Sequence, residues 1–314
     1  MLNQAQLDLL TERIVAQILD RERHQEAHSQ ESSSFAPSLL PSPAAPAPHT
    51  EEPVDITDPQ VRRQPLVDLP DERCRQALDR MMRSTPARIG VGRAGPRLKT
   101  RTLLTLRADH ATAMDSVFSP MDAALLERLG LPVIQTRCQD KNQHITRPDL
   151  GRQLDDQAIA QLKGFAAMGP DVQIIVSDGL SSKAIEANLE RILPVLEDGL
   201  RASGVKLGKT FFVRYGRVPV QDVVAQTLGA KVVCTLIGER PGLATAESMS
   251  AYLCYDAKVG QPEARRTVLS NIHKEGIAAV EAGAYLVELI GRILAQKASG
   301  VELMKQAPQK EVQS

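Results

Sequence analysis

The chain has 314 residues, 38 basic and 38 acidic side chains, and only 3 % aromatic residues, with no tryptophan. A formal net charge of zero gives no electrostatic basis for binding nucleic acid or an anionic membrane. So few aromatic rings also argue against a surface that stacks bases. We therefore expect neither a nucleic-acid partner nor a membrane partner.

The four cysteines are scattered along the chain and form no Cys-x-x-Cys pair. This spacing signals neither a zinc site nor a redox pair, and we expect no metal site. Cys234 lies inside an apolar run, where a buried and unreactive thiol is expected. There is no apolar run of transmembrane length and no secretory signal, so a reducing cytoplasm is the simplest compartment.

The first 24 residues predict an amphipathic helix, because Leu7, Leu10, Ile14 and Ile18 fall on one face. Residues 25–66 are rich in Pro, Ser and Ala and predict a disordered linker. A helix on such a tether cannot bury its apolar stripe on itself. It would dock on the body or on a sister chain, or it would serve as an address peptide that lies in a groove of another protein.

Residues 67–314 predict the folded body. Helical patterns cover residues 71–83, 102–113, 153–168, 184–203, 220–229 and 278–297, and strand-like runs begin at residues 172, 211, 232 and 270. Strands that alternate with helices are typical of a doubly wound α/β fold. We therefore expect a mostly parallel sheet flanked by helices, with a helical N-terminal extension.

The runs that begin at Phe211 and Val232 are joined by a helical segment, which predicts a strand–helix–strand unit. We expect the two strands to be parallel neighbours whose carboxyl ends open on the edge where α/β sheets hold ligands. Glu239 follows one strand and could accept a hydrogen bond from a hydroxyl group. Arg217 and Arg240 could bind phosphate or carboxylate. An ion pair that only shapes the two loops is an equal alternative.

The segment from Gly90 to Gly95 spells Gly-x-Gly-x-x-Gly, the pattern of a dinucleotide-binding loop. That loop needs a buried strand before it, a helix after it and an acidic residue at the end of a second strand. Only a weak strand precedes this one, and Asp115, at the right distance, lies in a helical stretch. We reject nicotinamide binding and leave a solvated basic turn or an anion-binding loop as alternatives.

His144 lies in a polar loop and could be a base or a metal ligand. It has no second ligand at a metal-binding spacing, which favours a histidine at the surface or at an interface. His110 and His273 are equally isolated. Asp178 follows the strand at residue 172 and lies where a ligand would bind, but no recognisable catalytic constellation accompanies it.

Several long motifs resemble the small subunit of ethanolamine ammonia-lyase. They are Gly92–Arg97, Asp140–Asn142 with Thr146–Asp149, Ser177–Ser181, Phe211–Val218, Gly238–Leu243, Ser270–His273 and Gln296–Gly300. Together they extend from about residue 80 to residue 300. The N-terminal helix and linker match this family in character only.

The resemblance implies adenosylcobalamin as cofactor, held at the interface with a large subunit that is a β/α barrel and contains the substrate pocket. It implies radical conversion of ethanolamine to acetaldehyde and ammonia, with no catalytic residue on this chain. Carried over by position, Val218 and Glu239 would contact the cobalamin, and the neighbouring Arg217 would belong to the same site. Val268 lies where the family typically has a cysteine. The resemblance also implies that residues 1–24 direct the enzyme into a bacterial microcompartment by binding a shell protein.

Two rival functions remain open at this point. One is a self-sufficient nucleotide-dependent enzyme with its own base near Asp178 and Glu239. The other is a scaffold or cargo adaptor of a microcompartment that binds no cofactor.

Overall fold

The computed structural model describes residues 55, 56, 58, 61, 64–67, 69–85 and 87–305. The chain divides into two units, Met1–Val54 and Asp55–Ser314, and the described residues all belong to the second. The predicted helix over residues 1–24 and most of the predicted linker over residues 25–66 lie outside the described residues.

The described residues of the body form a six-stranded sheet with the order β3-β5-β4-β6-β7-β8. The strands from β3 to β6 are parallel, whereas β7 and β8 continue the sheet in antiparallel pairs. Their bounds are β3 Val133–Gln135, β4 Val172–Ser177, β5 Phe211–Arg214, β6 Val232–Gly238, β7 Met249–Tyr255 and β8 Thr267–Ile272.

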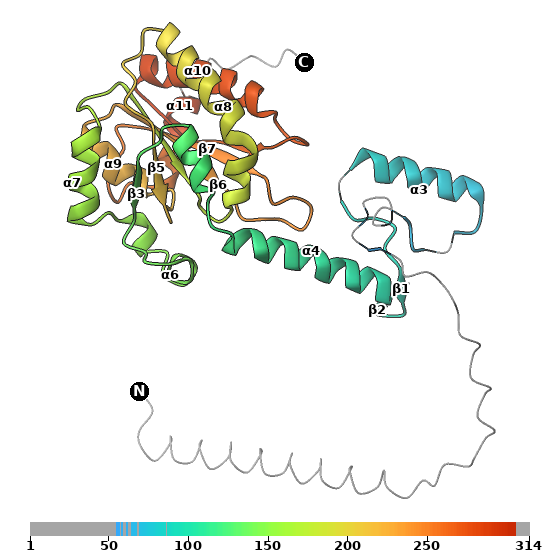
Figure 1. The fold of residues 1–314 in the computed structure, drawn as a ribbon. Helices are drawn as coiled ribbons and strands as arrows, with labels where there is room; N and C mark the ends of the chain where they lie inside the picture. The colour runs from blue at the N-terminus through green and yellow to red at the C-terminus, as the bar shows by residue number, and fades with distance from the viewer. Residues whose placement is uncertain are drawn as a thin grey trace, which may run out of the picture. The chain divides into compact units, whose positions relative to one another are not determined.

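Helices pack on both faces of this sheet, as Figure 1 shows for α7 and α9 on one face and α8 and α10 on the other. The first face is covered by α7 (Asp156–Phe165) and α9 (Val220–Leu228). The second face is covered by α5 (Ala123–Arg128), α8 (Ser182–Ala202), α10 (Ala279–Gln296) and α11 (Val301–Lys305). The expected doubly wound, mostly parallel sheet is therefore confirmed.

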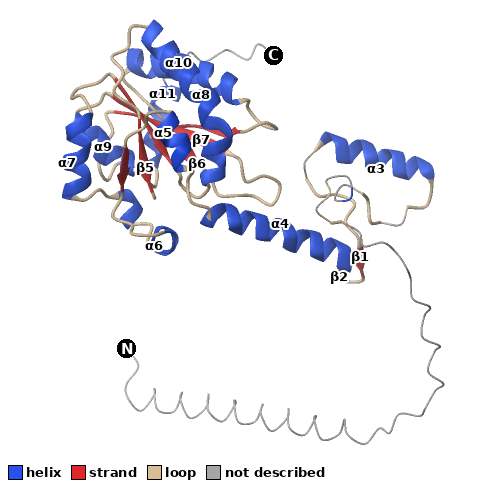
Figure 2. Cartoon of the chain, in the orientation of Figure 1, coloured by secondary structure: helices blue, strands red, loops and turns tan. Residues whose placement is uncertain are grey.

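The other described elements precede the sheet or lie between its strands (Figure 2). Two helices, α3 and α4, and a short hairpin come before β3, and a short helix, α6, follows β3. Their bounds are α3 Glu72–Ser84, β1 Arg93–Ala94, β2 Arg97–Leu98, α4 Thr100–Phe118, α6 Lys141–Thr146, and the 3-10 turns η1 Leu150–Arg152 and η2 Glu263–Arg265.

Local sequence explains where the main helices begin and end. The side chains of Asp140, Asp155 and Ser181 each accept a backbone N–H in the first turn of α6, α7 and α8, respectively. Gly229 ends α9 with a left-handed φ of 68°, a conformation that glycine adopts without strain.

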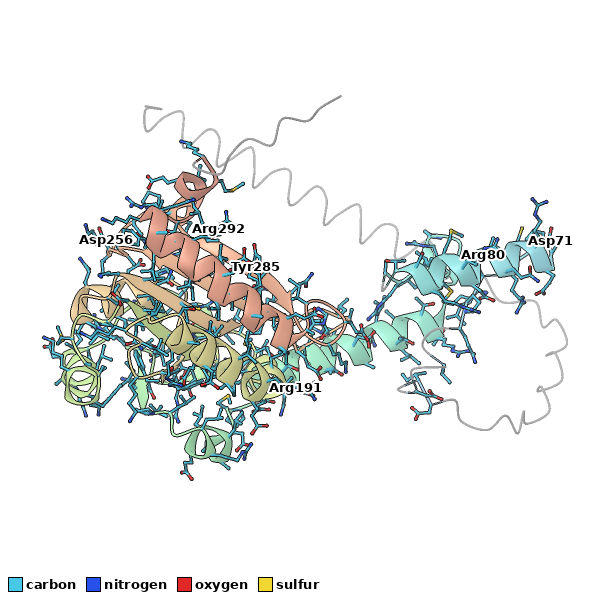
Figure 3. All side chains as sticks on the ribbon, turned by 90° about the horizontal axis from the view of Figure 1, so that it is seen from above. Asp71, Arg80, Arg191, Asp256, Tyr285 and Arg292 are labelled. Carbon is cyan, nitrogen blue, oxygen red and sulfur yellow. The ribbon has the colours of Figure 1, made fainter. Side chains whose placement is uncertain are left out.

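The helices α8 and α10 pack closely because small residues lie between them. A side chain at Gly283 would approach Val195 Cβ to 3.1 Å. Tyr285 and Arg292 lie on the opposite, outward face of α10, where both are exposed (Figure 3). The apolar spacing of residues 278–297 thus correctly predicted one buried face.

Two expectations about the strands were wrong. First, β4 lies between β5 and β6, so these two strands are parallel but not adjacent. Second, β3 and β7 were not anticipated, although Met249–Tyr255 is a largely apolar run of strand length. The strand expected at residue 270 begins at Thr267. Strand order depends on pairings between segments far apart in the chain, which local patterns do not encode.

Candidate functional site

The carboxyl ends of β4, β5 and β6 carry the residues singled out in the sequence. Because the three strands are parallel, Asp178, Arg217, Val218 and Glu239 follow them at the same edge of the sheet. The loops after β4 and β6 touch, since the backbone N–H of Leu180 donates to the Gly238 carbonyl at 3.0 Å. A side chain at Gly179, which has a φ of +51°, would collide with that same carbonyl.

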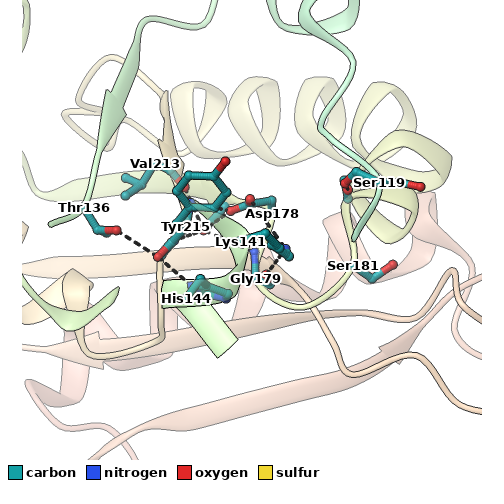
Figure 4. A network of polar contacts seen from close by, with 12 residues as sticks. Ser119, Thr136, Lys141, His144, Asp178, Gly179, Ser181, Val213 and Tyr215 are labelled. Atoms are coloured by element: carbon teal, nitrogen blue, oxygen red, sulfur yellow. Dashed lines mark hydrogen bonds and ion pairs between the residues drawn. The ribbon is translucent and has the colours of Figure 1, made fainter. Parts of the chain in front are cut away.

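The turn after β5 is held by hydrogen bonds to its backbone (Figure 4). Tyr215 has a left-handed φ of 57°, which is unusual for a residue with a large side chain. Its N–H donates to Asp178 Oδ1 at 2.7 Å. Its carbonyl oxygen accepts from Thr136 Oγ1 at 3.0 Å and lies 2.9 Å from His144 Nδ1.

Asp178 is a buried carboxyl group with a cationic neighbour. Lys141 Nζ lies 3.8 Å from Asp178 Oδ2 and donates to the Gly179 carbonyl at 2.9 Å. Burial raises the pKa of Asp178 and lowers the pKa of Lys141, and the attraction between the two groups opposes both shifts. The pair therefore ties the loop after β4 to α6.

His144 is fully buried within this chain, so the expectation of a histidine at the surface or at an interface was wrong. Burial, followed by the positive charges of Arg217 and Lys141, lowers its pKa to about 3. The ring is thus neutral near pH 7, and Nδ1 must carry the hydrogen because the Tyr215 carbonyl can only accept. Within the part of the chain that the structure describes, no hydrogen-bond partner is found for Nε2.

The Arg217 side chain turns toward α6. Its Nη2 donates to the His144 carbonyl at 2.5 Å, and its backbone N–H donates to the Gly151 carbonyl at 2.8 Å. Burial lowers the pKa of the guanidinium group. Arg217 therefore fixes the loop that carries Val218 rather than extending into solvent.

Glu239 forms a hydrogen bond, in which Ser250 Oγ on β7 donates to its Oε1. Among the described ion pairs, none joins Glu239 to Arg217 or Arg240. The alternative of an ion pair between these two loops is therefore wrong for this carboxylate. Sequence reasoning missed Ser250, because β7 itself was missed.

The outer strands extend this site along one face of the sheet. Tyr252 pairs directly with Val268 on β8 and with Thr235 on β6. Val268 is 46 % exposed, and Tyr252 is partly buried. The pKa of Tyr252 is raised by burial and then by the negative charge of Glu239. The carboxylate, the phenol and the valine thus border one surface that is accessible in this chain.

A buried ion pair anchors the border of this surface. Arg266 Nη2 lies 2.5 Å from Asp222 Oδ2, and both side chains are almost completely buried. Gln261 Nε2 also donates to Asp222 at 3.0 Å. Burial outweighs the attraction of Arg266 and raises the pKa of Asp222 to about 6. This pair connects α9 to the segment that leads into β8.

The glycine-rich motif does not form a nucleotide-binding loop. Residues 93–94 and 97–98 pair as a small antiparallel hairpin, and Gly95 has a φ of +59° in its turn. The strand-to-helix transition that a dinucleotide-binding loop requires is not formed at this motif.

In the described part of the chain, no cluster of three potential metal ligands is found, and no helix has the length and apolar character to cross a membrane. Cys234 is buried, and burial raises its thiol pKa to about 12, as expected for an unreactive cysteine. Two cavities of about 360 and 440 Å³ lie beside α4, and neither is lined by Val218 or Glu239.

Comparison with known proteins agrees with the motifs along the body. A family profile described as "Ethanolamine ammonia-lyase light chain (EutC)" matches residues 75–304. The ethanolamine ammonia-lyase small subunit of Clostridium tetani is 54 % identical over 249 residues, which are 79 % of this chain and 84 % of the relative. The small subunits of Clostridium perfringens and Listeria monocytogenes are 53 % and 49 % identical over the same shares.

These relatives are named as subunits of an ammonia-lyase, a carbon–nitrogen lyase whose small subunit works with a large one. The matched region contains the whole six-stranded sheet and every residue of the site described above. The chain therefore belongs to the family of ethanolamine ammonia-lyase small (light) subunits.

Proposed function

We propose that this chain is the small subunit of an adenosylcobalamin-dependent ethanolamine ammonia-lyase and forms part of the cobalamin site with a large subunit. Membership of the family supports this function. The observation that carries it is the convergence of Val218 and Glu239 at one sheet edge, next to the accessible face that bears Tyr252 and Val268.

The residues at this edge fit a corrin, which is broad, largely apolar and fringed with amide groups. Val218 is partly exposed and Val268 is exposed, so both can pack against a flat apolar ligand. The Glu239 carboxylate and the Tyr252 hydroxyl can accept hydrogen bonds from amide N–H groups. Arg217 would belong to the site as the neighbour that fixes Val218.

Bound adenosylcobalamin would supply homolytic cleavage of its cobalt–carbon bond, which starts the conversion of ethanolamine to acetaldehyde and ammonia. This chain would bind and orient the cofactor. We assign it no catalytic residue, and we place the substrate pocket on the large subunit. A self-sufficient enzyme would instead need a base at the edge, yet the described groups there hold backbone atoms or one another.

Equilibrium binding of adenosylcobalamin to the assembled two-subunit complex tests this proposal. Glu239→Ala should raise the dissociation constant about three- to tenfold, which corresponds to one lost hydrogen bond. Glu281→Ala, on the exposed side of α10, is the matched control and should leave it unchanged. Equal affinities for both variants would remove Glu239 from the site, and ethanolamine turnover by this chain alone would overturn the two-subunit assignment.

We further propose that residues 1–24 form a targeting helix, that residues 25–66 form its linker and that residues 67–314 form the cobalamin-binding domain. The helix would bind a shell protein and bring the enzyme into a bacterial microcompartment. Deleting residues 1–24 should then abolish encapsulation and leave turnover of the assembled enzyme intact. Loss of turnover would show that this segment belongs to the catalytic assembly.

A further inference from the structure

The short helix α6 lies at the crevice between β4 and β5. After β4 the chain continues into α8 on one face of the sheet, and after β5 it continues into α9 on the other face. Adjacent strands whose connections leave toward opposite faces open a crevice at their carboxyl ends, which is the usual ligand site of such sheets. Here side chains of α6 occupy this position (Figure 4).

Two side chains of α6 bind the two loops that border the crevice. Lys141 Nζ donates to the Gly179 carbonyl in the loop after β4 at 2.9 Å. His144 Nδ1 donates to the Tyr215 carbonyl in the turn after β5 at 2.9 Å. In the opposite direction, the Arg217 side chain in the turn after β5 donates to the His144 carbonyl on α6. The helix therefore spans the crevice from one loop to the other.

Each of these loops leads directly to a residue of the proposed cofactor site. Tyr215 lies three residues before Val218, and the intervening Arg217 is held by α6 and by Gly151. The loop after β4 contacts Gly238, which immediately precedes Glu239, through the hydrogen bond from Leu180. A shift of α6 would therefore move the Val218 and Glu239 loops relative to each other.

Close packing makes this link stiff. A side chain at Gly151 would lie 2.8 Å from Arg217 Cγ and 3.0 Å from the Tyr215 carbonyl, so this backbone has no room to move toward the turn. Asp178 holds the other side of the same turn through the Tyr215 N–H. Both backbone polar groups of Tyr215 are thus satisfied by side chains, in a conformation that a non-glycine residue rarely adopts.

We propose that Lys141 and His144 are positioning residues that fix the spacing between the loops carrying Val218 and Glu239. The two residues act through backbone carbonyls and do not themselves contact the cofactor. This inference rests on the proposed function of the edge, and it assigns to α6 a role in cofactor affinity.

Two variants of His144 test the proposal in the assembled complex. His144→Leu removes the donor to Tyr215, whereas the side-chain amide of His144→Asn can replace Nδ1. His144→Leu should weaken adenosylcobalamin binding about tenfold, because the Tyr215 carbonyl loses one of its two donors and keeps only Thr136 Oγ1. His144→Asn should restore the affinity to within about threefold of the original chain.

Hydrogen–deuterium exchange of the cofactor-free complex supplies an independent readout. Peptides covering residues 177–182 and 211–220 should exchange faster in His144→Leu and return to the original rate in His144→Asn. A general loss of stability would also accelerate exchange in α10, which serves as the internal control. Unchanged exchange in both peptides would overturn the proposal.

A second pair of variants covers the case in which His144→Leu does not assemble. Lys141→Met should accelerate exchange of residues 177–182 and weaken cofactor binding, and Lys141→Arg should do so less. If Lys141→Met changes neither property while Glu239→Ala weakens binding, the proposed site stands and the role of α6 is wrong. If Glu239→Ala is also without effect, Glu239 does not belong to the cofactor site, and the proposed link from α6 to that site falls with it.

Discussion

Two regions on either side of β6 use buried polar groups for different purposes. Between β4 and β5, the buried side chains of Lys141, His144 and Asp178 bind backbone atoms of two loops. Beyond β6, the buried ion pair of Asp222 and Arg266 joins two side chains and connects α9 to the segment that leads into β8. The first arrangement controls where individual loop residues lie.

The two regions also differ in what they leave accessible. His144 and Asp178 are buried in the crevice, whereas Val268 on β8 is 46 % exposed. The buried groups of the crevice thus hold the loops in place, whereas the outer strands provide the accessible surface. This difference supports the proposal that the described titratable groups with strongly shifted pKa values in the crevice hold loops in place, although such groups often mark a catalytic centre.

The largest expected effect concerns the ion pair beyond β6. Arg266→Met leaves Asp222 buried without its cation, and we expect a loss of about 3–5 kcal/mol in the free energy of unfolding. Urea unfolding of the purified chain, followed by circular dichroism, measures this loss. The double variant Asp222→Asn with Arg266→Met should recover most of it. A single variant as stable as the original chain would show that the pair does not anchor β8.

The turn after β5 should be nearly as sensitive. A methyl group at Gly216 would lie 2.5 Å from Ser177 Oγ, so Gly216→Ala should destabilise the chain by about 1–3 kcal/mol. Adding Ser177→Ala removes the clashing oxygen and should recover part of the loss. Gly164→Ala, in α7, has open space and should stabilise the chain by about 0.5–1 kcal/mol. Equal effects at the two glycines would contradict the tight packing of the turn.

The crevice should also give stability a dependence on pH. The pKa of His144 is lowered to about 3 in the folded chain, below the ordinary value of 6.5, so the unfolded chain binds more protons between these values. This contribution is fully present above pH 6.5 and is lost as the pH falls toward 3. We expect the contribution of His144 to stability to be about 1 kcal/mol smaller at pH 5.5 than at pH 7.

His144→Asn should remove this part of the pH dependence, because asparagine does not titrate. Urea unfolding at several pH values compares the two chains. Parallel stability curves between pH 5.5 and 7 would mean that His144 is not held in its neutral form. Asp222, with its raised pKa, contributes in the opposite direction and is unchanged in both chains.

The smallest effect is expected on the exposed outer strand. Val268→Cys introduces the residue that the family resemblance associates with a cobalamin contact. If Val268 acts by packing, the dissociation constant of adenosylcobalamin should change less than about threefold, because the two side chains are similar in size. A much larger gain in affinity would show that sulfur is needed there.

The sequence alone predicted most individual elements of this fold. Apolar periodicity identified residues 278–297 as a helix with one buried face, and α10 covers residues 279–296. The apolar runs at residues 172 and 232 became β4 and β6, the most buried strands. Such patterns are local, since a helix or strand records which of its faces is buried within a few residues.

The family motifs also identified the loops at the carboxyl edge, because their glycines and charged residues directly follow the strands. Sequence reasoning did not, however, predict strand β7 or the position of β4 between β5 and β6. It also interpreted His144 as a residue at the surface or at an interface, whereas His144 is buried within the chain.

Only the tertiary structure decided which distant groups meet. Tyr215 lies 71 residues after His144 and 37 residues after Asp178, yet all three share hydrogen bonds. Whether a histidine is a solvated base or a buried neutral donor depends on such neighbours, because burial and nearby charges set its pKa. The sequence by itself determined most of the secondary structure and the family resemblance, because both depend on local patterns. Long-range strand pairing determined the environment in which each polar side chain acts.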